Sequence, residues 1–251
     1  MSTRSYYNNV LVFDVETTGL IPYQKVGAEA HPLETLPHIL QLSFVVYNTT
    51  QKTITKTANH YIRVNDDLPI SEEITTLTGI DHKILKERGI PIANALKDFY
   101  EAYMNCDCIV AHNISFDRQM TMIEINRNSH VLESMGCISI KKVFEDEFQK
   151  QHHIDNFCTM RYSRGICKIE RVNKMGGKYY KNPRLVELYE HLFHRIPDNL
   201  HDSMVDTYAC LQCFAKMKLR HDLSNTNILM TSSASSASSA SSASSASASS
   251  T

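Results

Sequence analysis

The chain has 251 residues, with 26 lysines and arginines against 27 aspartates and glutamates, a formal net charge of −1 and a pI of about 6.9. This balance excludes the strongly basic composition that would by itself indicate nucleic-acid binding, although an enzyme that holds a strand end through metal ions needs no large basic face. The seven scattered cysteines, the polar start and the lack of a long apolar run predict an intracellular protein with reduced thiols and no membrane segment.

The C-terminal end differs in composition from the rest of the chain. From Thr231 onward the sequence holds only serine, alanine and threonine. Such a segment has neither charge nor large apolar side chains to offset the entropy that is lost when a backbone becomes ordered. We therefore expect one domain in residues 1–220, long enough for one substantial core, and a disordered tail in residues 221–251.

Three β-strands are expected in the first part of the chain. Val10–Phe13 is a continuous apolar run that ends in acidic residues, a pattern typical of a central strand that is buried on both faces. After an irregular stretch with several prolines, Ile39–Tyr47 and Thr53–Val64 are rich in β-branched and apolar residues. These two segments predict the second and third strands.

Helices and strands alternate after residue 70. Ser71 precedes two glutamates and opens a short helix that ends near Gly79, and apolar residues at helical spacing predict an amphipathic helix over Ile92–Tyr103. The other expected elements are a strand over Cys108–Ala111, a helix from Ser115 to about Asn128, a strand near Phe157–Tyr162, an exposed excursion over residues 163–182, a helix around Leu185–Phe193 and a last helix from about His201 to Lys218. This order indicates a mixed sheet with helices packed on it.

Two acids follow the first apolar run. Asp14 and Glu16 are separated by one residue, so on a strand their side chains point to the same face. Two unpaired carboxylates this close are costly unless a cation joins them, and hard oxygen ligands suit Mg²⁺ or Mn²⁺. Thr17 and Thr18 come next and could contact a sugar or a phosphate. The alternative is that both acids are simply solvated, and the Thr-Thr-Gly-Leu sequence after them argues against it.

A third acid, Asp117, lies where a short buried strand runs into the first turn of a helix. The helix dipole favours a carboxylate at this position, so a capping role explains Asp117 equally well. His112 and Asn113 at the end of the strand have a similar alternative explanation, since they could satisfy loose backbone groups.

The fourth acid, Asp206, lies within a helix that is otherwise suited to burial, where it needs a partner such as a metal ion. His201 precedes it by five residues, about 140° around a helix, so the two cannot share one helical face. His201 would have to reach the site from the loop side, where an imidazole can accept a proton near neutral pH. By itself, His201 is better explained as an exposed residue at a helix start.

Taken in order, these elements resemble the three exonuclease motifs of the DnaQ-like superfamily. The matching residues are Asp14-x-Glu16, then Asp117 after Ala-His-Asn, then His201-x4-Asp206, and the resemblance covers roughly residues 8–218. The spacing of the last motif is similar to that of the histidine-bearing (DEDDh) subgroup. The resemblance implies an α/β, RNase H-like fold with a five-stranded mixed sheet flanked by helices.

The resemblance also implies a mechanism. Two divalent ions, Mg²⁺ or Mn²⁺, would lie about 4 Å apart and clamp the scissile phosphate. Asp14, Glu16 and Asp206 would hold the first ion, Asp117 would support the second, which Asp14 also touches, and His201 would activate the attacking water. The residues expected beside the terminal nucleotide are Thr17, Thr18, Leu20, His112, Asn113 and Phe116.

The remaining polar clusters give weaker signals. The cysteine pairs Cys106/Cys108 and Cys210/Cys213 have few partner ligands at zinc spacing, and the second pair suits core packing on a helix. A zinc site could also be assembled from His152, His153, Cys158 and Cys167, although this is the minor alternative. A group of lysines and arginines between residues 168 and 184 is explained either as solvated surface or as a rim that guides a nucleic-acid strand.

The sequence therefore predicts a metal-dependent 3′→5′ exonuclease that hydrolyses phosphodiester bonds and releases nucleoside 5′-monophosphates. Its partner would be DNA or RNA with a free 3′ end. Two alternatives remain open: a proofreading or repair subunit of a larger polymerase assembly, and a catalytically silent nucleic-acid-binding protein on the same fold. The sequence does not choose between DNA and RNA, or between a monomer and a homodimer.

Overall fold

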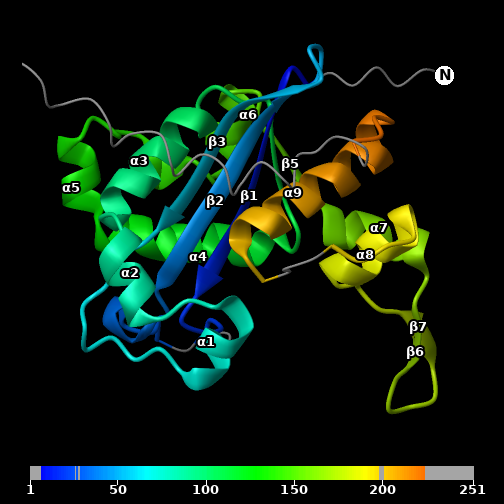
Figure 1. Cartoon of the computed structure of the whole chain (residues 1–251), viewed down its shortest axis with the longest axis horizontal. Coiled ribbons are helices and arrows are strands. Elements are labelled where there is room, and N and C mark those ends of the chain that lie inside the picture. Colours follow the sequence, from blue (N-terminus) through cyan, green and yellow to red (C-terminus); the bar gives the residue numbers. More distant parts are fainter. Residues whose placement is uncertain (1–6, 26, 28, 198–200, 224–251) are drawn as a thin grey trace, which may run out of the picture.

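The computed structural model describes residues 7–25, 27, 29–197 and 201–223 (Figure 1). The tail predicted for residues 221–251 lies outside the described residues from residue 224 onward. Of its first residues, Leu223 is buried and its carbonyl accepts a hydrogen bond from the Gln212 side chain. Among the described residues, no helix combines the length and the apolar composition that a membrane span requires.

A five-stranded mixed sheet forms the centre of the molecule, as the sequence predicted. Its strand order is β3-β2-β1-β4-β5; β1 pairs antiparallel with β2 and parallel with β4, β2 pairs antiparallel with β3, and β4 pairs parallel with β5. The strands are β1 Asn9–Thr17, β2 Ile39–Asn48, β3 Thr53–Tyr61, β4 Cys108–Ala111 and β5 Asp155–Cys158.

The helices cover both faces of this sheet (Figure 1). They are α1 Glu72–Thr78, α2 His82–Arg88, α3 Ile92–Tyr103, α4 Ile114–Arg127, α5 Ser129–Ser134, α6 Asp146–Gln151, α7 Thr159–Cys167, α8 Leu185–Phe193 and α9 Ser203–Phe214, which continues as a π-helical turn, Ala215–Leu219. Two short 3₁₀ turns lie at Leu33–Thr35 and Ile140–Lys142.

Strand β1 divides the core by the alternation of its side chains. Leu11, Phe13 and Val15 belong to the large apolar cluster that includes α3 and α4. Val10 and Val12 point the other way, into the cluster built with α9. Because side chains alternate along a strand, the even-numbered positions of β1 face α9.

Several element boundaries differ from those expected, for local reasons. The strand expected near residues 157–162 ends at Cys158, because Thr159 begins α7. The last helix begins at Ser203 rather than His201, because the Asp202 side chain caps it by accepting hydrogen bonds from the amides of Met204 and Val205. Helices α2, α5 and α6 were not expected at all.

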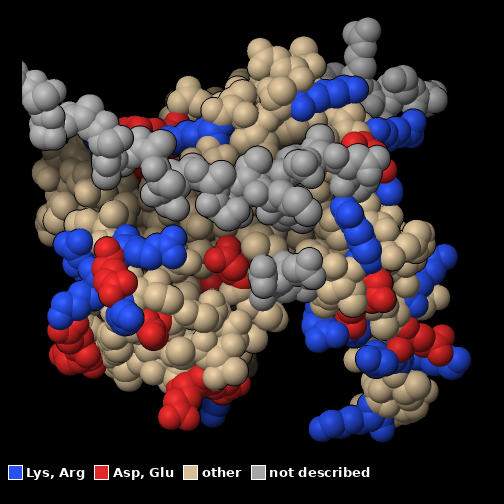
Figure 2. All heavy atoms as spheres, in the orientation of Figure 1, with Lys and Arg blue, Asp and Glu red and all other residues tan. Residues whose placement is uncertain are grey.

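The segment expected as an exposed excursion contains a small antiparallel hairpin. Its strands are β6 Glu170–Val172 and β7 Lys178–Tyr180, which make up a separate two-stranded sheet. In Figure 1 the hairpin stands away from the body beyond α7 and α8, and Figure 2 shows lysine and arginine side chains along it. All six strand residues are exposed, so the hairpin contributes nothing to the core.

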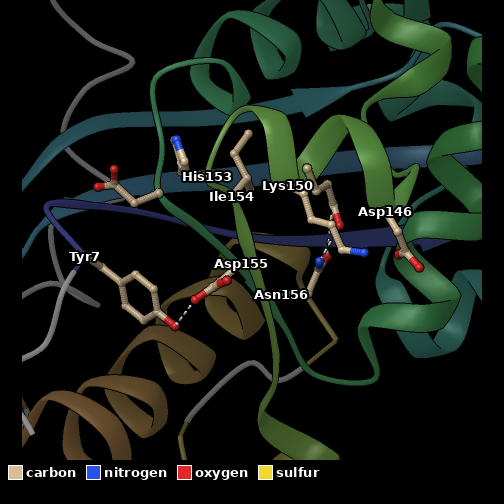
Figure 3. A pocket seen from close by; sticks show the side chains of 9 residues that line it. Tyr7, Asp146, Lys150, His153, Ile154, Asp155 and Asn156 are labelled. Carbon is tan, nitrogen blue, oxygen red and sulfur yellow. Dashed lines mark hydrogen bonds between the residues drawn. The ribbon is translucent and has the colours of Figure 1, made fainter.

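A pocket of about 580 Å³ opens near the starts of β4 and β5 (Figure 3). The Tyr7 hydroxyl donates a hydrogen bond to the Asp155 carboxylate at 2.8 Å, and the Asp107 carboxylate accepts from the amides of Asn8 and Asn9. These acids therefore have partners within the protein. They also lie at the opposite strand ends from Asp14 and Glu16, which are near the carboxyl end of β1.

Substitution of Phe99 in α3 would measure how much the stability of the main core depends on one side chain. Phe99 is 1% exposed, and its ring centroid lies 5.1 Å from that of Phe13 and 5.8 Å from that of Phe44. We expect Phe99→Ala to lower the free energy of unfolding by about 3–5 kcal/mol, because it leaves a cavity between helix and sheet. Urea unfolding measures this, with Phe99→Leu as the milder control; equal values for both variants would contradict the assignment.

Candidate metal centre and active site

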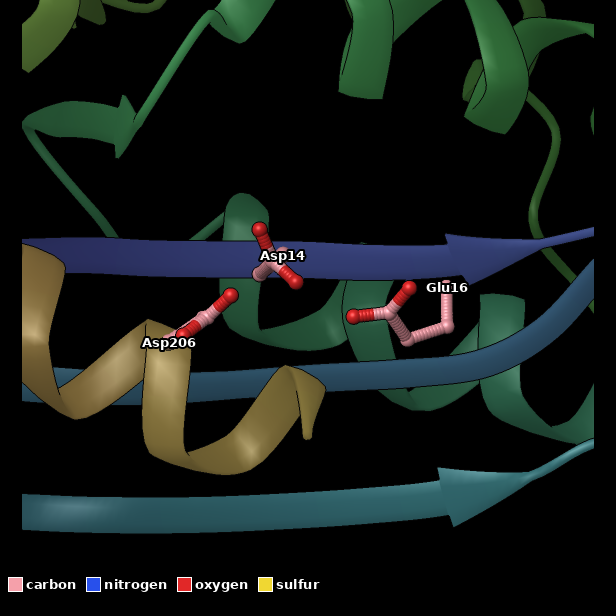
Figure 4. Close-up of side chains that lie close together, drawn as sticks. All are labelled: Asp14, Glu16 and Asp206. Atoms are coloured by element: carbon pink, nitrogen blue, oxygen red, sulfur yellow. The ribbon is translucent and has the colours of Figure 1, made fainter. Parts of the chain in front are cut away.

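Three carboxylates converge beside the carboxyl half of β1 (Figure 4). Asp14 and Glu16 come from β1 and Asp206 comes from α9, and one ligand atom from each can be chosen so that all lie within 4.8 Å of one another. The geometry follows from the sequence: Asp14 and Glu16 occupy even positions of β1 and therefore face α9, where Asp206 lies in the first turn. Among the described residues, this is the one group of three or more acids, histidines or cysteines with ligand spacing.

Polar side chains of β2 and α9 fix the distance between the strand and the helix. The Ser203 hydroxyl donates a hydrogen bond to the backbone oxygen of Asp14 at 2.8 Å. The Ser203 amide donates to the Gln41 side chain at 3.3 Å, and Gln41 lies opposite Glu16 in the β1–β2 register. The cap residue Asp202 accepts a further bond from Gln41 at 3.4 Å. The start of α9 is thus bound directly to the strands that carry the acids.

The sequence analysis did not identify these supporting residues. Gln41 and Ser43 are fully buried polar residues in an otherwise apolar run, and both lie on the α9 face of β2. In the sequence, these two polar residues alternate with apolar ones, which could have indicated that they share one face of the strand. Asp202 could also have been recognised, since an aspartate before a helical run is a common N-cap.

Burial and mutual repulsion make the three acids reluctant to ionise. Burial is the largest influence on Asp14, and the negative charges of Asp117, Asp206 and Glu16 add to it, so the pKa of Asp14 lies well above its ordinary value. Burial, followed by repulsion from Asp206, Asp202 and Asp117, raises the pKa of Glu16 to about 8. Burial raises the pKa of Asp206 to about 7, with a smaller contribution from Asp202. A cation between these groups would relieve both effects.

One atom in the cluster lacks a partner that a cation could supply. The Oδ1 atom of Asp206 is buried and has no hydrogen-bond partner within the described structure. An unpartnered buried carboxylate oxygen is costly unless a proton or a metal ion occupies its lone pairs. Three carboxylates with close ligand atoms and one open oxygen suit a hard divalent cation.

Asp117 lies next to the cluster on the first turn of α4. It is 3% exposed, and burial raises its pKa to about 8, although hydrogen bonds from its own amide and that of Val15 act in the opposite direction. Its charge raises the pKa of both Asp14 and Glu16. The structure therefore brings the fourth predicted acid to the same site, beside the group of three.

His201 lies in the loop that precedes α9, outside the helix that carries Asp206. It is exposed and lies two positions before α9, with a left-handed φ of 73°. Its backbone forms a hydrogen bond with Asp206 that lowers the pKa of that carboxyl. The His201 ring is not among the ligand atoms that cluster around Asp14.

The residues after Glu16 form a fixed turn. The Thr17 hydroxyl donates to the backbone oxygen of Gly19 at 2.8 Å. Thr18 exchanges two hydrogen bonds with His38: its amide donates to the His38 oxygen, and its hydroxyl accepts from the His38 amide, both at 2.9 Å. Both threonine hydroxyls therefore hold the turn, while Leu20 extends into solvent with 84% of its surface exposed.

The three candidates near α4 have different surroundings. Both ring nitrogens of His112 are engaged, Nδ1 with the Thr159 hydroxyl at 2.9 Å and Nε2 with the backbone oxygen of Pro183 at 3.1 Å. Burial lowers the pKa of His112 to about 4, so the ring is neutral at physiological pH. Asn113 adopts a left-handed φ of 71° and accepts a hydrogen bond from Ser115, and Phe116 packs partly buried against the main core.

The seven cysteines are all free thiols. Cys106, Cys108, Cys210 and Cys213 are buried, which agrees with the core-packing interpretation for the helical pair. His152, His153, Cys158 and Cys167 do not form a group with metal-ligand spacing among the described residues.

Comparison with known proteins identifies the family. The profile of the family described as RNase_T, exonuclease, matches residues 11–214 of this chain. The chain therefore belongs to this exonuclease family, which confirms the resemblance to DnaQ-like 3′→5′ exonucleases drawn from the motifs. No curated protein sequence matches the chain.

Solved structures of Exonuclease I share the fold. The E. coli enzyme in complex with a dA16 oligonucleotide matches with a TM-score of 0.55 at 19% identity, over 85% of this chain and 42% of that one. The zinc-bound E. coli ExoI–ssDNA complex matches with a TM-score of 0.57 at 20% identity, over 85% and 41%. A further structure of Exonuclease I gives 0.58 at 20% identity, over 85% and 42%. This chain thus corresponds to less than half the length of those proteins.

The raised carboxyl pKa of Asp206 has a consequence for stability. The folded protein retains this proton up to about pH 7, whereas the unfolded chain releases it near the ordinary value of 3.8. The free energy of unfolding of the metal-free protein should therefore fall as pH rises from about 4 to 7, and metal binding should stabilise more at pH 8 than at pH 6. At Mn²⁺ concentrations roughly 100-fold above Kd, we expect a gain of about 2.7 kcal/mol at pH 8, seen as a Tm rise of about 5–10 °C.

Thermal melting with EDTA or Mn²⁺ measures this, and Asp206→Asn provides the decisive comparison. This variant should melt at a higher temperature than the natural chain at pH 8 in EDTA, because a buried charge is removed, and should lose most of the Mn²⁺ effect. An unchanged Mn²⁺ effect in Asp206→Asn would show that the ion binds elsewhere.

Proposed function

We propose that this chain removes nucleoside 5′-monophosphates from the free 3′ end of DNA or RNA by metal-assisted hydrolysis at the site of Asp14, Glu16, Asp117 and Asp206. The convergence of these four acids at the carboxyl end of β1 carries the proposal. Similar structures of Exonuclease I contain DNA oligonucleotides, which supports a nucleic-acid strand end as the substrate.

Asp14, Glu16 and Asp206 are the proposed ligands for a first ion, Mg²⁺ or Mn²⁺, and Asp117 with Asp14 would support a second. When bound, such ions polarise a phosphoryl oxygen and lower the pKa of a bound water. The burial of the acids favours binding, because ion pairing is stronger where water is excluded. The hydrogen bonds from Ser203 and Gln41 keep the strand and the helix at a fixed separation, so the ligands are arranged before an ion arrives.

His201 is the proposed general base. His201 is exposed in the loop next to Asp206, and an imidazole that reaches the site from there could accept a proton from the attacking water and pass it to solvent. The backbone contact between His201 and Asp206 ties the loop to the metal ligands. His112 serves the site in another way: as a neutral ring held at both nitrogens, it fixes the end of β4 relative to α7 and α8.

The terminal nucleotide would lie between the turn after β1 and the start of α4. Hydrogen bonds within the protein fix the Thr17–Thr18 turn, and the exposed Leu20 side chain that follows can pack against a base. Asn113 and Phe116, at the start of α4, would border the nucleotide on the other side. Phe116 keeps part of its ring accessible, which suits contact with a base.

The metal ligands provide the first test of this function. Asp14→Asn and Asp206→Asn should each lower kcat for digestion of a 5′-labelled oligonucleotide in Mg²⁺ by about three orders of magnitude or more, because each removes a ligand. The control is Asp66→Asn, which should retain full activity. Asp66 is a highly exposed acid whose carboxylate lies 4.0 Å from the Lys86 ammonium group. Activity at the natural level in both ligand variants would refute the proposed site.

The role of His201 is tested separately from metal binding. His201→Asn should lower kcat by about 10²- to 10⁴-fold, the usual range for a lost general base, and asparagine tolerates the left-handed backbone at this position. Mn²⁺ affinity, measured by calorimetry, should change far less than kcat, since the ring holds no ligand position. A large loss of Mn²⁺ affinity would instead assign His201 to the metal centre.

A further inference from the structure

The segment between the start of α7 and the start of α8 carries the densest positive charge in the chain. Residues 161–184 contain eight lysines and arginines against one glutamate, whereas the whole chain has a net charge of −1. The charged residues are Arg161, Arg164, Lys168, Glu170, Arg171, Lys174, Lys178, Lys181 and Arg184. The other parts of the chain are therefore acidic overall, which makes this segment the natural place for a polyanion to bind.

Ion pairs neutralise only part of this charge. Lys178 pairs with Glu170 at 2.9 Å, and both Lys181 and Arg184 pair with Glu187 of α8. Within the part of the chain that the structure describes, the remaining five cations form no ion pair. They are Arg161, Arg164, Lys168, Arg171 and Lys174.

The hairpin β6–β7 presents one of these free cations beside an exposed aromatic ring. Arg171 lies opposite Tyr179 in the strand register, so the two share one face, and Tyr179 is 50% exposed. The opposite face carries Val172, Tyr180 and the neutralised Lys178. Proteins bind single-stranded nucleic acids through cations placed next to accessible aromatic rings. Phosphates bind to the positive charge, and unpaired bases stack on the ring.

Hydrogen bonds order both the turn of the hairpin and its base, where it joins the rest of the chain. At the turn, the Asn173 side chain accepts hydrogen bonds from the amides of Met175 and Gly177 at 2.9 and 2.8 Å, which holds Lys174 at the tip. At the base of the hairpin, the Lys181 amide donates to the Ile169 oxygen at 3.0 Å. These contacts reduce the entropy lost when the hairpin binds a ligand.

A direct contact links the base of the hairpin to the active-site segment. The backbone oxygen of Pro183 accepts from Nε2 of His112, which lies between β4 and the helix that carries Asp117. In Figure 1 the hairpin projects at the end of the molecule toward which β1 points, and Figure 2 shows an open notch between it and the surface over α1 and α2. A strand whose 3′ end lies at the acids can therefore extend toward the hairpin.

We propose that the hairpin β6–β7, together with Arg161 and Arg164 of α7, binds the phosphate backbone and bases of the single-stranded substrate on the 5′ side of the terminal nucleotide. This inference rests on the proposed function, because it takes the strand at the acidic site as its starting point. The hairpin sets affinity for long strands, whereas the acidic site performs the hydrolysis.

The first experiment compares long and minimal substrates. The hairpin variant Arg171→Ala/Lys174→Ala is matched by Lys83→Ala/Lys86→Ala, which removes two exposed lysines of α2. For 5′-labelled single-stranded 20-mers of DNA and of RNA, the hairpin variant should raise KM by about tenfold with kcat unchanged, and the α2 control should not. Hydrolysis of the p-nitrophenyl ester of thymidine 5′-monophosphate, which has no upstream phosphate, should be equal in all three proteins.

Salt dependence gives a second measure that does not require cleavage. Binding of a fluorescent 20-mer in Ca²⁺, followed by anisotropy, should show a log–log salt slope that is about 1.4 smaller in the hairpin variant, the value for two lost phosphate contacts on a single strand. A slope and a KM equal to those of the natural chain would overturn the inference. Comparison of the DNA and RNA 20-mers shows whether the hairpin also discriminates between the sugars.

The two tyrosines of the hairpin provide a matched test of base stacking. Tyr179 and Tyr180 have similar exposure, 50% and 46%, but lie on opposite faces. Tyr179→Ala should weaken binding of the single-stranded 20-mer by about fivefold or more and leave a blunt duplex unaffected, whereas Tyr180→Ala should change little. Equal effects of both substitutions would contradict the assigned face.

These results also separate the inference from the proposed function. If the natural chain digests neither the 20-mers nor the ester, the proposed function is wrong, and the anisotropy measurement still decides whether the hairpin binds strands. If the natural chain digests both and the hairpin variant is unaffected in KM and salt slope, only the inference is wrong.

Discussion

The removal of four neighbouring carboxylates from water is the constraint on which the rest of the site depends. It raises the pKa of Asp14, Glu16, Asp117 and Asp206, and repulsion from nearby acids raises the pKa of Asp14 and Glu16 further. A fold that keeps such groups together needs rigid surroundings, and here a central strand and a capped helix supply them. The acids destabilise the metal-free folded state, and a cation that binds between them removes this destabilisation, which strengthens its binding.

Much of the fold followed from simple patterns in the sequence. The alternation of β1, the helical spacing of α3 and the order of strands and helices predicted the mixed sheet correctly, because burial of apolar side chains determines these elements. The pairing of Asp14 with Glu16 on one face followed from the same alternation. The partnership with Asp206 came only from the order of the motifs, since a contact between residues far apart in sequence has no local signal.

Other features depended on contacts that the sequence does not display. The start of α9 is set by the Asp202 cap and by Gln41, a residue of a distant strand. The role of His112 was not visible either, because its two partners, Thr159 and Pro183, come from segments that fold beside it. The hairpin strands are short and exposed on both faces, so they show neither the alternation nor the apolar run that identifies a strand.

The alternation along β1 also limits how this protein can diverge. The odd-numbered residues of β1 pack in the core against α3. On the even-numbered side, Val10 and Val12 are core residues, whereas Asp14 and Glu16 are metal-ligand candidates. An insertion or deletion of one residue just before Asp14 would therefore turn both acids toward the apolar cluster and bring Val15 to the metal centre. Changes of length should accumulate in the loop between β1 and β2, whereas the spacing inside β1 should stay fixed in any descendant that keeps its chemistry.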